Sequence, residues 1–174
     1  MISRGTGLAL AVPTAALGLA GLLGGLIWAW WADPATYMAV PGGAALGQEQ
    51  LGRLFAVEVR YAVVGLAGGF AVAAPLVLRL RWVGWRLIPG LLLGSAVGGG
   101  LAYVVGVLAG PGDPATAVPG EQPQAPLDVQ TPSFFLSWPI GALLAVVVVC
   151  WLLDRQPAGP YDPGEAPRHG LWRR

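Results

Sequence analysis

Glu58 and Arg60 are the ionisable residues best placed to do chemistry, because both lie near the start of a long apolar segment. A charge inside the hydrocarbon layer is costly, so such a residue is a candidate for function. The two are separated by two positions, so on a helix they face different directions and are not expected to pair. Both can instead anchor the helix near the membrane surface, and Glu58 can also bind a cation, a partner or another arginine.

Redox and metal chemistry have few candidate ligands in this chain. It contains one histidine, His169, and one cysteine, Cys150, too few for a bis-histidine haem, a tetrahedral zinc site or an iron–sulfur cluster. Ser95 and Ser137 lie in or near apolar segments, but no histidine or lysine is there to activate them. We therefore expect no catalytic, metal-binding or cofactor-binding residues and no enzyme. The remaining catalytic alternative is an intramembrane enzyme that uses the carboxylate and the guanidinium named above.

Four apolar segments form the elements that must position these residues. Of the 174 residues, 55% are apolar and only 11% are charged. A membrane-spanning helix needs about 20 mostly apolar residues, and four segments meet this length: 7–31, 55–78, 87–110 and 134–153. The sequence predicts an all-α polytopic membrane protein, with four transmembrane helices in an up-down bundle over residues 1–155. Residues 156–174 are rich in proline and glycine and are expected to form a disordered cytoplasmic tail.

The distribution of arginine predicts the orientation of the bundle. The first segment is longer than the core of a signal peptide, which has about 7–15 residues, so we expect it to be retained as a span. If the N-terminus is cytoplasmic, every arginine except Arg53 and Arg60 lies on the cytoplasmic side. Because cytoplasmic loops carry an excess of arginine and lysine, we expect a multi-pass protein of the plasma membrane with both termini cytoplasmic.

Seven tryptophans are expected to act as interfacial anchors, since tryptophan is enriched at both membrane surfaces. They are Trp28, Trp30, Trp31 and Trp138 near the outer surface and Trp82, Trp85 and Trp151 near the inner surface.

Small residues recur at every fourth position of the third segment and predict a helix-packing ridge. They are Gly90, Gly94, Gly98, Ala102, Gly106 and Gly110. Helix association in lipid relies on close packing, which small residues permit by letting two backbones approach. The ridge is interpreted as packing within the four-helix bundle. The alternative is an interface with a second copy or with a partner helix.

Two outer connections, 32–54 and 111–133, are long enough to form a contact surface. Residues 48–54 of the first are expected to start the second helix early. Six prolines in the second favour an extended path resembling polyproline. The tetrapeptide Asp-Pro-Ala-Thr at 33–36 recurs at 113–116, which suggests either a duplicated hairpin or a chance repeat of a turn signal.

Two short motifs resemble a known family. The first is Gly-Gly-Leu-Ile-Trp-Ala-Trp at 24–30, and the second is Pro-Leu-Asp-Val-Gln at 126–130, followed by Trp138 and Pro139. Together they resemble a family of uncharacterised four-span integral membrane proteins from actinobacteria, grouped as a domain of unknown function. The resemblance covers about residues 17–153. It implies a plasma-membrane location and the four-span layout, and it implies no activity.

The features together favour a non-catalytic accessory, scaffold or assembly subunit that acts through helix packing and its two extracytoplasmic loops. The expected partners are the lipid bilayer and another membrane protein or a second copy. A net charge of +1 argues against nucleic acid, whose binding requires a basic surface. The alternative function is a subunit of a small oligomeric transporter or channel. The apolar spans argue against ion-coupled transport, which normally uses buried charges.

Overall fold

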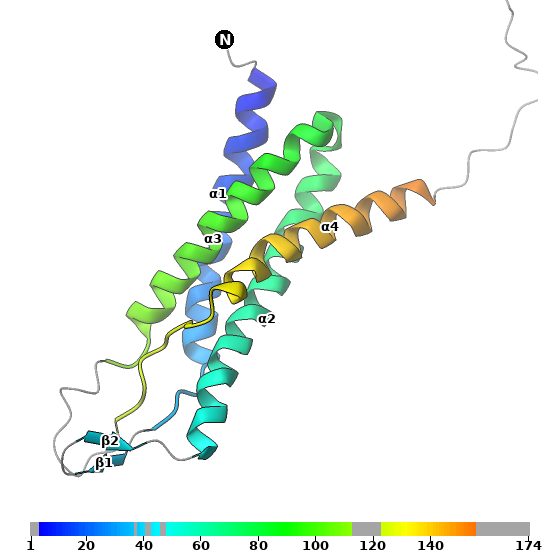
Figure 1. The fold of residues 1–174 in the computed structure, drawn as a ribbon. Helices are drawn as coiled ribbons and strands as arrows, with labels where there is room; N and C mark the ends of the chain where they lie inside the picture. Colours follow the sequence, from blue (N-terminus) through cyan, green and yellow to red (C-terminus); the bar gives the residue numbers. More distant parts are fainter. Residues whose placement is uncertain (1–3, 37, 41–42, 46–47, 113–122, 156–174) are drawn as a thin grey trace, which may run out of the picture.

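The computed structural model describes residues 4–36, 38–40, 43–45, 48–112 and 123–155, in which four long helices form a bundle (Figure 1). The helices are α1 (Arg4–Trp31), α2 (Gln48–Arg79), α3 (Leu87–Ala109) and α4 (Ser137–Asp154). Each contains or belongs to a segment long and apolar enough to cross a membrane. The predicted bundle of four helices, each long and apolar enough to span a membrane, is confirmed, and α2 does begin early, at Gln48. The predicted tail, 156–174, lies outside the described residues.

Short elements connect the helices. Strands β1 (Met38–Val40) and β2 (Gly43–Ala45) form a small antiparallel hairpin after α1. The 3₁₀ segments are η1 (Arg81–Arg86), between α2 and α3, and η3 (Pro132–Leu136), before α4. Within η1 the chain reverses at Gly84, whose φ of 65° lies in the left-handed region that glycine adopts without strain. We call the two ends of the bundle the hairpin end and the η1 end.

The helices pack as two pairs, α1 with α3 and α2 with α4, rather than in chain order. Because successive spans alternate in direction, the two members of each pair run in the same direction, and α4 crosses α2 at an angle (Figure 1). Helices α2 and α3 are joined by the short segment η1 and run antiparallel, but they touch little. Close packing outweighs connectivity here, because the small-residue ridge of α3 lies directly against the backbone of α1.

The predicted ridge on α3 lies against α1 over much of its length. A Cβ atom added at Gly98 would lie 2.5 Å from the Leu17 carbonyl oxygen, and one at Gly94 would lie 2.7 Å from that of Pro13. Gly90 meets the backbone of Ala9 in the same way. The backbones therefore approach to a distance that leaves no room for a side chain on this face of α3.

The remaining ridge positions also face groups of the same chain. The backbone of Ala102 lies against Gly25 of α1, and Gly106 lies under the indole ring of Trp28. Gly110 follows the end of α3 and lies against Leu127. All six small residues are thus covered from within the chain.

Trp138 fills the centre of the bundle instead of anchoring it at a membrane surface. Its side chain has no exposed area. Glycines of the other three helices surround its ring, with added Cβ atoms at Gly24, Gly68 and Gly99 lying 3.0–3.3 Å from ring atoms. The glycines leave a space that only a large planar side chain fills, which is why this tryptophan is buried.

Trp28 is the second predicted anchor that the structure places in the core. It has no exposed area, its Nε1–H donates a hydrogen bond to the Val57 carbonyl oxygen (2.9 Å), and its ring meets Tyr61 edge-on at 5.1 Å between centroids. The polar group of the indole is therefore satisfied by α2 rather than by lipid headgroups. The other five predicted anchors are exposed: Trp30, Trp31, Trp82, Trp85 and Trp151.

Candidate functional site

Both connections at the hairpin end meet as extended chains. Residues 33–36 follow α1, and residues 123–131, which we call the strap, lead from beside the hairpin towards η3 and α4 (Figure 1). Thr36 and Gln124 form an antiparallel bridge, and the amide of Ala125 donates a hydrogen bond to the Ala35 carbonyl oxygen at 2.6 Å. The second copy of the repeated tetrapeptide, 113–116, lies outside the described residues.

The strap packs on the helices with alternate side chains. Ala125, Leu127 and Val129 are buried, whereas the residues between them are exposed. This period of two is the pattern of an extended chain with one face against a core. Leu127 and Val129 join the cluster that contains Trp28, Tyr61 and Trp138. The extended path expected for this connection is therefore present in the strap, but as a packed segment of the fold.

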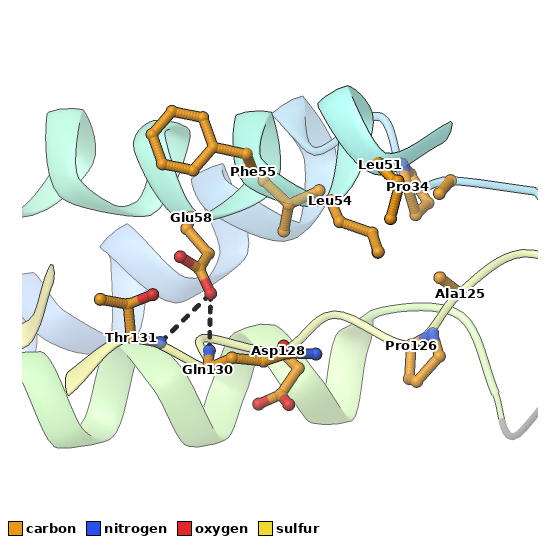
Figure 2. A pocket seen from close by; sticks show the side chains of 12 residues that line it. Pro34, Leu51, Leu54, Phe55, Glu58, Ala125, Pro126, Asp128, Gln130 and Thr131 are labelled. Atoms are coloured by element: carbon orange, nitrogen blue, oxygen red, sulfur yellow. Dashed lines mark hydrogen bonds between the residues drawn. The ribbon is translucent and has the colours of Figure 1, made fainter. Parts of the chain in front are cut away.

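Glu58 of α2 fastens the strap to the bundle. Its Oε1 accepts hydrogen bonds from the backbone amides of Gln130 (2.7 Å) and Thr131 (3.2 Å), as Figure 2 shows. Only 7% of Glu58 is exposed. A buried carboxylate requires strong donors, and hydrogen bonds from amides to a charged acceptor are stronger than those to a neutral one. The sequence offered anchoring, an arginine, a cation or a partner for this residue, and the structure gives it two amides of its own chain.

Asp128 holds the middle of the strap against α3. Its Oδ1 accepts hydrogen bonds from the Tyr103 hydroxyl (3.0 Å) and from the amide of Val129 (2.8 Å). The position of the strap is therefore fixed by two carboxylates, one on α2 and one in the strap itself.

Arg60 lies apart from Glu58, as expected from their spacing. Its guanidinium carbon is 6.0 Å from the centre of the Trp31 ring, a distance at which a cation is attracted to an aromatic face. Its Nη1 is buried and has no hydrogen-bond acceptor within the described part of the chain. The structure therefore brings Glu58 and Arg60 to the same end of α2 but not to one site.

A pocket of about 320 Å³ lies between the first turns of α2, the 33–36 segment and the strap (Figure 2). Helix α2 contributes apolar side chains together with the Glu58 carboxylate, and the strap contributes the polar residues Asp128, Gln130 and Thr131. The lining residues are Pro34, Ala35, Leu51, Leu54, Phe55, Val57, Glu58, Ala125, Pro126, Asp128, Gln130 and Thr131.

The pocket is suited to binding by combined apolar contact and hydrogen bonding. Its lining holds no histidine, cysteine or lysine. Across the described ranges, no three His, Cys, Asp or Glu side chains gather as a metal site would require. Beside it, Arg53 of α2 pairs with Asp33 at 3.5 Å, which ties the 33–36 segment to the helix. Gln50 does the same through its side-chain oxygen, which accepts a hydrogen bond from the amide of Thr36 at 3.0 Å.

Comparison with protein-family models, curated proteins and solved structures found no match for this chain. The resemblance to the actinobacterial four-span family therefore stays a prediction from its two short motifs.

The strap, and with it the pocket, was not predicted from the sequence. The signal was present as alternation: apolar Ala125, Leu127 and Val129 are separated by Pro126 and Asp128. Such alternation over five residues indicates an extended chain with one buried face. The six prolines of the connection instead favoured an extended path that does not pack on the helices.

Proposed function

We propose that this chain is a non-catalytic accessory, scaffold or assembly subunit of the plasma membrane that binds a partner protein at its hairpin end. One observation carries the proposal. The two connections at this end are tied to each other and to the helices, and they enclose a pocket of about 320 Å³. A surface held in this way pays little ordering entropy when it binds, which favours recognition.

The lining of the pocket defines the kind of partner. Leu51 and Phe55 are exposed apolar side chains on one wall. On the other wall, Asp128 and Gln130 are exposed polar residues of the strap. An extended segment that carries an apolar side chain beside a hydrogen-bond donor, such as an arginine, would pack on the apolar wall and donate hydrogen bonds to the polar wall. Such a segment would belong to another membrane protein or to its exterior domain.

The orientation belongs to the same proposal. Arg79, Arg81, Arg86 and Arg155 all lie near the η1 end, which the excess of positive charge in cytoplasmic loops assigns to the cytoplasm. The hairpin end with its pocket would then face outward, and both termini would be cytoplasmic. The resemblance to the actinobacterial four-span family implies the same plasma-membrane location.

Cysteine labelling tests the orientation. In a Cys150→Ser background, a membrane-impermeant maleimide applied to intact cells should label Gly112→Cys at the hairpin end. It should label Asp154→Cys, at the end of α4, only after the cells are opened. Both positions are exposed, so access to the reagent is the only difference. Labelling of Asp154→Cys on intact cells, with Gly112→Cys protected, would show that the orientation is the opposite of the one proposed.

Affinity purification from native membranes in mild detergent tests partner binding. The tagged protein should retain a stoichiometric companion, which Leu51→Trp should lose because the larger side chain fills the pocket. Leu136→Trp is the matched control, since Leu136 is outside the pocket lining and is as exposed (56%) as Leu51 (55%). Equal recovery of the companion with both variants would remove the pocket from the proposal. Recovery of a homo-oligomer without any companion would remove the accessory role.

A channel or transporter subunit is less well supported. The centre of this bundle is filled by Trp138, which has no exposed area. A pore would therefore have to form between copies, and many side chains on the outward surfaces of the helices are apolar. Ion or solute flux in liposomes that contain the purified oligomer would favour this alternative.

A further inference from the structure

A second cavity lies at the η1 end, the opposite end of the bundle from the pocket of Figure 2. It has a volume of about 270 Å³ and is lined by η1 and by residues of α2, α3 and α4 at this end of the bundle. Val77, Ile88 and Val146 are among the aliphatic residues that line it, and Arg81 and Trp85 lie at its η1 side. We call it the η1 cleft.

The η1 cleft opens to the surface of the bundle rather than to its centre. Trp85 is 75% exposed, and Cys150, which also lines the cleft, is exposed as well. Both residues belong to membrane-spanning segments. The molecules in contact with such a surface are lipids, and an apolar groove of this size accepts part of an acyl chain.

The charges around the η1 cleft are positive. Arg79, Arg81 and Arg86 are exposed, and the one ion pair found within the described residues joins Arg53 to Asp33 at the other end of the molecule. Asp154 is the one carboxylate near this end in the described part of the chain. Trp82 and Trp85, on either side of Gly84, are the residue type that lies at headgroup depth.

We infer that the η1 cleft binds one anionic phospholipid from the surrounding leaflet. An acyl chain lies in the apolar groove between η1 and α4, and the phosphate lies against Arg81. Basic pockets between transmembrane helices are a recurring way to hold such headgroups. A zwitterionic lipid fills the groove equally well but carries a positive group that the neighbouring arginines repel, so charge decides the preference.

Native mass spectrometry of the detergent-solubilised protein tests this inference. The protein is titrated separately with phosphatidylglycerol and phosphatidylcholine of the same acyl chains, and the occupancy of the first bound lipid is compared. Each arginine near a headgroup contributes about a fivefold preference for the anionic lipid. The expected preference is therefore at least fivefold for the full chain.

Two variants and two matched controls locate the site. Arg81→Gln should lower the preference about fivefold. Arg155→Gln removes a charge that lies outside the cleft lining and stacks on the Trp151 ring (3.6 Å), so it should leave the preference unchanged. Val146→Trp fills the groove and should weaken binding of both lipids. Val147→Trp places the same side chain one residue further on. Val147 is 63% exposed and lies outside the lining, so this variant should bind both lipids as the unmodified chain does.

Three results would overturn the inference. The first is equal binding of the two lipids by the unmodified chain. The second is a preference for phosphatidylglycerol that survives Arg81→Gln and Val146→Trp. The third is a dimer that Val146→Trp dissociates, which would make a second copy the occupant of the η1 cleft. Arg81 is exposed, so its variant is expected to fold, and circular dichroism of each variant checks this.

Discussion

Replacement of Glu58 tests whether one buried carboxylate holds the strap on the bundle. In Glu58→Ala the amides of Gln130 and Thr131 lose their acceptor, while the apolar contacts of the strap stay in place. Two hydrogen bonds to a charged acceptor contribute about 1.5 kcal/mol each at the lower end of the measured range. The free energy of local opening at these two amides should therefore fall by about 3 kcal/mol.

Glu58→Gln removes the negative charge but keeps a hydrogen-bond acceptor at the same position. The glutamine side chain has the same shape and still offers an oxygen to both amides, but the hydrogen bonds become neutral and about half as strong. The expected loss is about 1.5 kcal/mol. The two variants therefore form a graded series in which the amides of Gln130 and Thr131 are protected most in the unmodified chain and least in Glu58→Ala.

Hydrogen–deuterium exchange measured by mass spectrometry on peptides from the strap checks the series. Since about 1.4 kcal/mol is a factor of ten, exchange of the two amides should be about tenfold faster in Glu58→Gln and about a hundredfold faster in Glu58→Ala. Gln130→Ala is the control, because it removes an exposed side chain and keeps the backbone donor. Unchanged exchange in Glu58→Ala, or equal acceleration in Gln130→Ala, would refute the role assigned to the carboxylate.

Two further substitutions test the interior of the bundle. Gly98→Leu should lower the free energy of unfolding by about 3 kcal/mol, because its Cβ would lie 2.5 Å from the Leu17 carbonyl oxygen; Gly100→Leu, where nothing lies within 4 Å, should not. Thermal unfolding and size in detergent measure both, and equal stability of the two variants would contradict the packing argument. Trp138→Ala should cost about 3–5 kcal/mol by opening a cavity, whereas Trp82→Ala, at a 66% exposed position, should leave thermal unfolding unchanged. A similar loss in both tryptophan variants would mean that the indole of Trp138 does not support the core.

The four spans could be predicted because their signal is local. A helix must satisfy every backbone polar group within lipid, so about 20 apolar residues in succession nearly dictate a spanning helix. The small-residue ridge on α3 could be predicted in the same way, since residues four positions apart lie on the same face of a helix. The identity of the helix that packs on this ridge could not, because α1 and α2 both carry glycines and only their fit to α3 distinguishes them.

The strap and the buried tryptophans depend on contacts between distant parts of the chain. A tryptophan at the end of an apolar segment fits a membrane surface, and its sequence position gives no sign of whether the packed helices leave a space for its ring. For Trp138 that space is formed by glycines of three other helices. The partners of Glu58 are backbone amides some 72 residues away, and amides carry no side-chain signal in a sequence.

The sequence by itself determined that the chain forms four helices long and apolar enough to span a membrane, and which face of α3 is lined with small residues, because hydropathy and residue size act on each helix separately. Only the tertiary structure decided the pairing of α1 with α3, the burial of Trp28 and Trp138, and the pocket that Glu58 and the strap enclose. These features arise where close backbone approach, side-chain volume and hydrogen-bond donors from distant segments meet, and their energies exist only once the helices have packed.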